Sequence, residues 1–241
     1  MLNQDFQNQV RANKFDEWVG ALQVREVIRL GVGRSILDVG CGIGQFTPMF
    51  LEHFARVVGL DPNGEYLKVA RDAMLDGYHA FLEYIQGSAE SFSIDEKFNT
   101  ITMNNLLEHV DDPVAVLRNC NRHLTPNGRI IAQVPNANSV ARRLGVLMGI
   151  IPSIEHISEK ERDLYGHKRT YTMHELISDY DKAGLSVIAY GGILYKPLPN
   201  EFLQKLCESQ GMEWTEKLID ALYCFGKDRP EECAQIYVAG Y

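Results

Sequence analysis

The feature that most constrains the fold is an apolar stretch that runs directly into three alternating glycines, Ile-Leu-Asp-Val-Gly-Cys-Gly-Ile-Gly at residues 36–44. Glycine lets the backbone turn sharply and lets a ligand approach it closely. In an open α/β sheet, ligands bind at the carboxyl ends of strands, where such a turn would lie. A second acid, Asp61, ends the next strand candidate about 20 residues after Gly40, where a carboxylate can accept hydrogen bonds from ribose hydroxyls. The pattern therefore predicts a site for a nucleoside-type ligand.

Short apolar runs alternate with helical patterns on both sides of this turn. Strand candidates are residues 35–39, 56–60, 83–86, 98–103, 129–134, 185–190 and 234–239, and helical candidates are 15–30, 45–53, 64–75, 113–124, a helix beginning near 172, and about 201–225. This βαβ alternation predicts a parallel sheet that is covered on both faces. We expect one domain over residues 1–241, with a lid insertion at about 137–170 and a helical insertion at about 200–226.

Charge and cysteine usage exclude several function classes. The formal net charge of −8 repels nucleic acid phosphates, so we expect no nucleic acid partner. The five cysteines are scattered without a C-x-x-C pair, which argues against a disulfide scaffold and a structural zinc site. The first residues lack the apolar core of a signal peptide, and no apolar stretch reaches 18 residues, so we expect a cytoplasmic protein.

A dinucleotide-binding fold is the rival interpretation of the glycine turn. Its fingerprint is G-x-G-x-x-G/A, whereas here the glycines are spaced G-x-G-x-G and Gln45 occupies the third position of that fingerprint. The acid Asp38 precedes the first glycine by two residues. A pyrophosphate would be repelled by a carboxylate there, whereas a ligand that carries an amino acid group would not.

The chain resembles the class I S-adenosylmethionine (SAM)-dependent methyltransferases. Residues 38–44, followed by Gly-Leu-Asp at 59–61, are similar to motifs I and II of that family. Later landmarks agree: Gly-Ser-Ala-Glu at 87–90, a fourth-strand motif that ends in Leu-Glu-His-Val at 107–110, and Leu-x-Pro-x-Gly at 124–128. The resemblance implies a Rossmann-like, doubly wound, seven-stranded sheet, mostly parallel with an antiparallel last strand, and a helical lid.

The resemblance also implies a cofactor site. Glycines 40, 42 and 44 would leave room for the methionyl part of SAM, Asp38 would lie near its ammonium group, and Asp61 would hold the ribose hydroxyls. Ser88 and Ala89 would meet the adenine edge, although many members carry Asp where this chain has Ser88. The full set of expected contacts with SAM, and with its product S-adenosylhomocysteine, is Asp38, Gly40, Cys41, Gly42, Gly44, Asp61, Pro62, Ser88, Ala89, Glu90 and Asn104.

Two histidines are candidates for catalysis. His109 closes the Leu-Glu-His-Val motif, and His167 lies in a polar Tyr-Gly-His-Lys-Arg-Thr-Tyr cluster of the expected lid at 165–171. A positioned base helps most when the methyl acceptor is a weakly acidic hydroxyl. Asp111 and Asp112 begin a helix, where acids stabilise the N-terminus, and we expect no metal.

The expected reaction is methyl transfer to a hydroxyl of a small molecule or of a sugar or glycan precursor. The alternatives are a quinone-precursor O-methyltransferase, a small-molecule N-methyltransferase, and a SAM-binding regulatory or scaffold subunit. Residues 142–151 are apolar behind two arginines. A lid helix is the preferred interpretation of that segment, over contact with a membrane surface. Nothing in the sequence predicts an oligomeric state.

Overall fold

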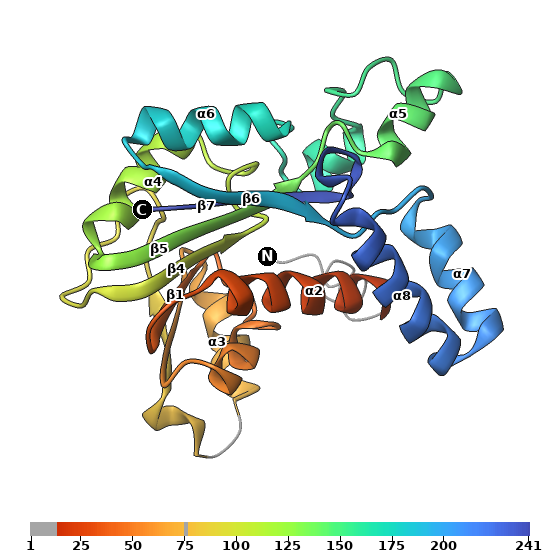
Figure 1. The fold of residues 1–241 in the computed structure, drawn as a ribbon. Coiled ribbons are helices and arrows are strands. Elements are labelled where there is room, and N and C mark those ends of the chain that lie inside the picture. Colours follow the sequence, from red (N-terminus) through yellow and green to blue (C-terminus); the bar gives the residue numbers. More distant parts are fainter. Residues whose placement is uncertain (1–13, 75–76) are drawn as a thin grey trace. The chain divides into compact units, whose positions relative to one another are not determined.

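The computed structural model describes residues 14–74 and 77–241 (Figure 1). These residues divide into two compact units, and each is described by itself. The larger unit comprises Val24–Val134, His174–Tyr190 and Tyr237–Tyr241, and it holds most of the sheet. The smaller unit comprises residues 14–23, Pro135–Met173 and Gly191–Ile236. The expectation of a single domain stays a prediction.

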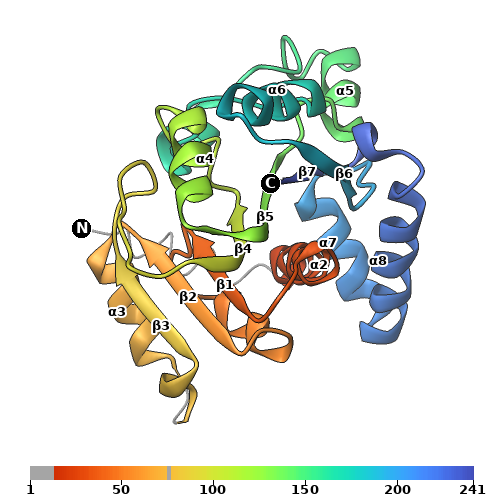
Figure 2. The same ribbon diagram turned by 60° about the vertical axis from the view of Figure 1, so that its left-hand side comes forward.

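A seven-stranded sheet forms the centre of the fold. Its strands are β1 (Ser35–Val39), β2 (Arg56–Asp61), β3 (Leu82–Gln86), β4 (Phe98–Asn104), β5 (Leu124–Pro135), β6 (Val187–Ile193) and β7 (Gln235–Gly240). They follow the order β3-β2-β1-β4-β5-β7-β6, in which β1 pairs in parallel with β2 and β4, β2 with β3, and β4 with β5, whereas β7 is antiparallel (Figure 2). The predicted fold class is therefore confirmed.

Helices cover both faces of the sheet in the larger unit, which explains why its central strands are apolar runs without alternation. Helices α4 (Pro113–Arg122) and α6 (Met173–Ala183) lie on one face, and α3 (Gly64–Asp72) lies on the other (Figures 1 and 2). Ile36, Leu37 and Ile101 have no exposed surface. The buried Tyr180 of α6 donates a hydrogen bond to the carbonyl of Val238 at 2.9 Å, which fastens that helix to β7.

Most predicted elements are confirmed within two residues of their ends, including the long helix α2 (Lys14–Leu30). Two others differ in kind, and a third, β5, differs in where it begins. The helix predicted at 45–53 is a short 3-10 helix, η1 (Thr47–Glu52), with Pro48 in its first turn. The helix predicted at 201–225 is two helices, α7 (Asn200–Gln210) and α8 (Met212–Gly226), because the chain turns at Gly211 with φ +86°. Strand β5 begins at Leu124, before the predicted Asn-Gly turn, and the register with β4 shifts between Phe98 and Thr100.

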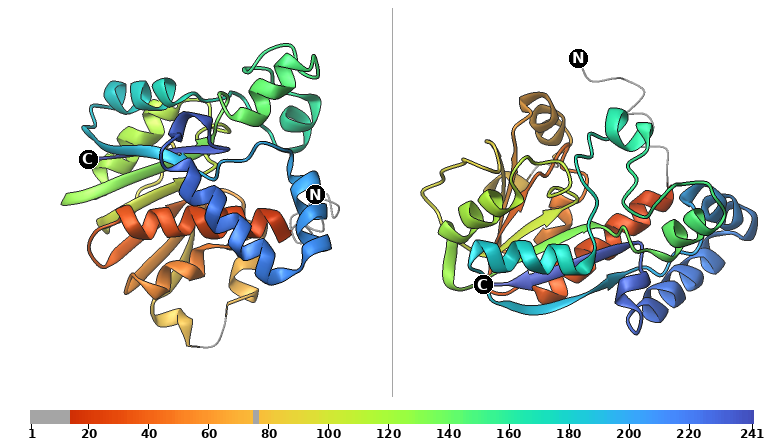
Figure 3. Two further views of the ribbon diagram at one scale, coloured as in Figure 1. Left: turned by 45° about the vertical axis from the view of Figure 1, so that its right-hand side comes forward. Right: turned by 90° about the horizontal axis from the view of Figure 1, so that it is seen from above.

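The smaller unit is built from short helices. It contains α5 (Val140–Leu147), the π-helix η3 (Lys160–Leu164), the 3-10 helix η4 (Pro230–Glu232), and a hairpin of α7 and α8 (Figure 3). A remaining 3-10 helix, η2 (Tyr78–Ala80), belongs to the larger unit. Within the described residues, no helix has the length and apolar character needed to cross a bilayer.

One guanidinium organises the segment between α5 and η3. Arg142 donates hydrogen bonds to the carbonyls of Ile154, at 2.9 Å, and His156, and it pairs with the Glu161 carboxylate at 2.8 Å. Glu161 in turn accepts hydrogen bonds from the backbone N–H and the hydroxyl of Ser158. These bonds and the charge of Arg142 outweigh burial, so the pKa of Glu161 lies below its usual value. The carboxylate therefore stays ionised and keeps the pair intact.

Candidate active site

The glycine turn follows β1 at the carboxyl end of the sheet. Gly40, Gly42 and Gly44 adopt φ values of +79°, +55° and +70°, which side chains other than glycine rarely tolerate. The backbone N–H groups of Gly40 and Cys41 both donate to the carbonyl of Leu60, at 2.7 and 3.1 Å. The turn is therefore tied to the end of the neighbouring strand β2 rather than left free in solvent.

The glycines of the turn are needed for different reasons. A Cβ on Gly44 would lie 2.4 Å from the Tyr84 hydroxyl and 2.8 Å from the Ala70 Cβ, so that glycine lets the turn pack against β3 and α3. A Cβ on Gly42 would meet no atom of the described residues within 4 Å. Gly42 therefore borders open space at the sheet edge, which is the arrangement that a ligand resting on the backbone requires.

Asp61 ends β2 and holds two backbone groups. Its Oδ2 accepts a hydrogen bond from the N–H of Gly42 and its Oδ1 accepts one from the N–H of Asn63, both at 2.9 Å. Asn63 caps the N-terminus of α3, so the carboxylate joins the glycine turn to that helix. Burial is the main reason why the pKa of Asp61 lies above its usual value. Each oxygen keeps lone pairs with which to accept a ligand hydroxyl.

Asp38, on β1, is the second buried carboxyl of the site. The Thr47 hydroxyl donates a hydrogen bond to its Oδ2 at 2.7 Å. Burial, together with the negative charge of Asp61, raises the pKa of Asp38 to about 6, although the bond from Thr47 opposes the rise. A ligand that brings a positive charge would favour the ionised form. The pair of carboxyls and the open space at Gly42 thus fit a ligand with an ammonium group and vicinal hydroxyls.

The loop after β3 carries the residues that are predicted to contact the adenine ring. Its first turn closes on itself, because the carbonyl of Ser88 accepts hydrogen bonds from the N–H groups of Ser91 and Phe92 at 3.1 and 2.8 Å. The Ser88 hydroxyl donates to the carboxylate of Glu90, so an acid lies beside Ser88 although position 88 itself has none. Ala89 is buried and Glu90 is exposed.

The remaining predicted cofactor residues border the same strand ends. Cys41 follows Gly40 in the turn and is half-buried, and burial, with the nearby carboxylates, raises the pKa of its thiol. Pro62 follows Asp61, and its carbonyl accepts a hydrogen bond from the Gln86 amide at 3.0 Å. Asn104 ends β4, where its amide oxygen accepts a hydrogen bond from the Thr102 hydroxyl at 3.3 Å. The structure thus brings all the predicted cofactor residues to the carboxyl edge of the strands.

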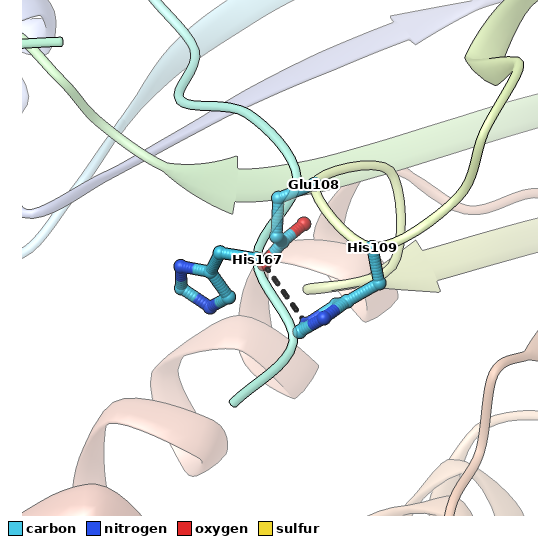
Figure 4. Close-up of side chains that lie close together, drawn as sticks. All are labelled: Glu108, His109 and His167. Atoms are coloured by element: carbon cyan, nitrogen blue, oxygen red, sulfur yellow. Dashed lines mark ion pairs between the residues drawn. The ribbon is translucent and has the colours of Figure 1, made fainter. Parts of the chain in front are cut away.

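His109 and Glu108 are neighbours in the loop after β4, with 3.8 Å between the His109 Nε2 and the Glu108 Oε1, a distance at which they form an ion pair when both are charged (Figure 4). Glu108 is almost completely buried, and no group among the described residues donates a hydrogen bond to its carboxylate oxygens. Burial raises the pKa of Glu108 to about 8, so this carboxyl is mostly protonated at neutral pH. The half-buried His109 is the partner that can draw Glu108 into its ionised form.

His167, the other predicted catalytic histidine, belongs to the smaller unit. Its backbone N–H donates to the carbonyl of Glu161 at 2.9 Å, and its ring lies 6.0 Å from that of Tyr165. The residue is half-buried. Its position is therefore set through Glu161 by the same network that contains Arg142.

Sequence reasoning missed Thr47 and Tyr84 as parts of the site. Thr47 lies in a segment predicted as an ordinary helix, and nothing in the pattern indicates that its hydroxyl turns toward Asp38. Tyr84 lies on β3 between the exposed Glu83 and the half-buried Ile85, and this strand pattern predicts that Tyr84 is buried but not that it contacts the glycine turn. The signal that could have found Thr47 is the proline after it, because proline in the first turn of a helix marks Thr47 as a residue of the N-terminus.

The pKa of Asp38 predicts how ligand affinity depends on pH. Because a bound ammonium group favours the carboxylate, the affinity for S-adenosylhomocysteine should fall as pH is lowered through about 6, toward tenfold per pH unit. Thr47→Val removes the opposing hydrogen bond and should shift this fall to higher pH, whereas Thr170→Val in the smaller unit should not. Titration calorimetry between pH 5 and 8 measures it. An affinity of the wild type that is flat over this range would contradict the prediction.

Comparisons with known proteins agree on one family. Residues 15–190 match a family model described as a methyltransferase domain. A ubiquinone biosynthesis O-methyltransferase from Aeromonas salmonicida is 34% identical over 173 residues, which cover 70% of this chain and 70% of the relative. One of the same name from Idiomarina loihiensis is 30% identical over 201 residues, 83% of this chain and 76% of the relative. A solved SAM-dependent methyltransferase from Mesorhizobium loti is 18% identical with a TM-score of 0.62, covering 94% of this chain and 99% of that one.

Proposed function

Because this chain belongs to the class I SAM-dependent methyltransferases, we propose that it methylates a hydroxyl group of a quinone precursor. The observation that carries the proposal is the likeness to O-methyltransferases of ubiquinone biosynthesis, at 30 to 34% identity over 70 to 83% of the chain. For this reason we prefer a quinone precursor to a sugar hydroxyl, although the sequence alone favours the sugar or small-molecule hydroxyl.

The cofactor site follows from the two buried carboxyls and the glycine turn. Asp38 would face the ammonium group, Asp61 would accept hydrogen bonds from the ribose hydroxyls, and the open space at Gly42 would receive the methionyl chain. The loop from Ser88 to Glu90 would meet the adenine, and Asn104 would line the site at the end of β4. When bound, SAM supplies a methyl group activated on a sulfonium, so the chain's own work is alignment, exclusion of water and management of one proton.

His109 is our first candidate for the base that accepts the hydroxyl proton. Its imidazole has Glu108 as a neighbour, 3.8 Å away. The positive charge that His109 gains with the proton would lower the pKa of Glu108, and the Glu108 carboxyl would stabilise the imidazolium through its oxygens without giving up its own proton in the step. Glu108 is then a positioning and stabilising residue, and its burial makes it responsive to the charge of its neighbour. His167 is the second candidate, on the smaller unit.

An apolar acceptor is supported by the exposed end of α5. Leu147, Met148 and Ile150 are 82%, 71% and 69% exposed, and the exposed Arg143 lies on the same helix. Exposed apolar side chains next to positive charge suit an acceptor that resides in lipid. The sequence-based preference for an ordinary lid helix is the competing interpretation of this segment.

The experiment that tests the proposal supplies methyl-labelled SAM with two cell extracts, one of soluble sugars and nucleotide sugars and one of lipids. Label is expected in a lipid product whose mass rises by one methyl group and whose label resists alkaline hydrolysis, as an aryl ether does and an ester does not. Asp61→Ala should abolish the label, and Glu52→Gln, an exposed acid outside the site, should leave it unchanged.

The other outcomes each contradict the proposal in a different way. Label confined to the soluble extract would favour the sugar hydroxyl, and label on nitrogen would favour an N-methyltransferase. Binding of S-adenosylhomocysteine without label in either extract would favour a SAM-binding regulatory or scaffold subunit.

A further inference from the structure

The C-terminal half of α4 holds the loop that follows β3. Asn119, on α4, is 5% exposed, and its side-chain amide donates hydrogen bonds to the carbonyls of Ala89, at 3.2 Å, and Phe92, at 3.1 Å. Both donor hydrogens of the amide are thereby used on one loop. The buried Asn119 amide fixes the loop backbone to α4 at two points, because neither carbonyl can move without losing a hydrogen bond in a place that water does not reach.

His123 extends this contact by one helical turn. Its Nδ1 lies 2.9 Å from the carbonyl of Asn119, and its Nε2 lies 3.3 Å from the backbone nitrogen of Ile94. A carbonyl only accepts and a backbone N–H only donates, so the arrangement requires a neutral imidazole with its hydrogen on Nδ1. The imidazole also packs against the ring of Phe92, with 4.4 Å between the ring centroids. Asn119 and His123 together therefore fix the loop at both its middle and its end.

This contact decides which way the loop presents its free donors. In a trans peptide the C=O and the following N–H point in opposite directions. Because the Ala89 carbonyl points toward Asn119, the Glu90 N–H points away from α4. The Ser88 carbonyl is turned into the loop by the N–H groups of Ser91 and Phe92, so the Ala89 N–H points out of it. Within the described residues, neither outward N–H has an acceptor.

We propose that Asn119 and His123 are positioning residues for adenine recognition, which orient the N–H groups of Ala89 and Glu90 toward the ring nitrogens of the base. The inference rests on the proposed SAM site and adds α4 to it. An adenine ring offers acceptor nitrogens at its edge, and two fixed backbone donors match them without further rearrangement on binding. Ala89 and Glu90 would then contact the adenine, whereas Asn119 and His123 would set the affinity for the cofactor without contacting it.

The test compares Asn119→Leu, which keeps the approximate volume of the side chain and removes both donors, with Asn121→Leu on the exposed face of the same helix. Titration calorimetry should show the Kd for S-adenosylhomocysteine raised about tenfold by Asn119→Leu and unchanged by Asn121→Leu. The KM for SAM should rise by a similar factor, while kcat at saturating SAM stays within twofold, because α4 touches neither the methyl group nor the acceptor in this proposal.

A second variant covers the case in which Asn119→Leu does not fold. His123→Phe keeps a ring against Phe92 and removes both the acceptor for the Ile94 N–H and the donor to the Asn119 carbonyl, and it should raise the Kd about threefold. Amide hydrogen exchange should become faster in peptides covering 88–94 and remain unchanged in β1 and β2. Wild-type affinity in both variants, or a fall in kcat without a change in KM, would overturn the inference. Failure of the wild-type protein to bind S-adenosylhomocysteine would instead overturn the proposed function.

Discussion

Gly44→Ala is expected to destabilise the protein by about 3 kcal/mol, because a positive φ and two close contacts act together. The backbone at Gly44 has φ +70°, and the added methyl would lie 2.4 Å from the Tyr84 hydroxyl and 2.8 Å from the Ala70 Cβ. Both neighbours are buried, so neither can move aside without disturbing β3 or α3. Chemical denaturation followed by circular dichroism measures the loss in the free energy of unfolding.

Gly42→Ala is the matched control, and it distinguishes a loss of stability from a loss of ligand affinity. Gly42 has φ +55°, but its added methyl would point into open space. The cost to stability should be limited to about 1 kcal/mol for the backbone conformation, while the methyl occupies the space in which we propose that SAM binds. The variant should therefore fold and bind S-adenosylhomocysteine at least about tenfold more weakly. Equal destabilisation by the two substitutions would show that the space beside Gly42 has been misassigned.

Asp61→Ala is expected to weaken binding of S-adenosylhomocysteine by about a hundredfold, or about 3 kcal/mol. The loss has two parts. The carboxylate would no longer accept hydrogen bonds from the ribose hydroxyls, and the N–H groups of Gly42 and Asn63, each 2.9 Å from a carboxylate oxygen, would lose their acceptor. The turn would then no longer be held in the conformation that the ligand needs.

Two further variants make the prediction for Asp61 specific. Asp61→Asn keeps one oxygen and should cost about tenfold in affinity, because it preserves one of the two backbone contacts. Asp72→Asn, on the exposed side of α3, should have no effect. Titration calorimetry gives the affinities, and denaturation checks that each variant is folded. If Asp61→Ala bound within twofold of the wild type, the carboxylate would have no part in the site.

The clustering of the glycine turn and Asp61, where we propose that SAM binds, could be predicted from the sequence because these residues lie close to one another along the chain. Gly40, Gly42 and Gly44 follow one strand directly, and Asp61 ends the next, so the parallel pairing of β1 and β2 brings them together. The strand positions themselves follow from apolar runs that are buried on both faces. Local pattern and tertiary structure agree here, which is why the predicted ends of β1 and β2 lie within two residues of the observed ones.

Contacts between distant residues could not be predicted in the same way. Asn119 and Ala89 are separated by 30 positions, and only the packing of α4 beside the loop reveals that an amide on a helix holds that loop. Gly211 likewise divides a continuous helical pattern, because the amphipathic period of α7 and α8 alone does not show a change of direction at φ +86°. Thr47 could not be predicted for two reasons. Its segment forms a 3-10 helix where the pattern predicts an ordinary helix, and its partner Asp38 lies on a different element, the strand β1.

The anchoring of residues 154–161 on Arg142 has a consequence for how such a segment can evolve. The guanidinium binds two main-chain carbonyls and one carboxylate, and the Ser158 hydroxyl binds the same carboxylate, so the conformation depends mainly on Arg142, Ser158 and Glu161. The other positions of the segment can therefore change identity without loss of its shape, as in a loop that varies on a constant framework.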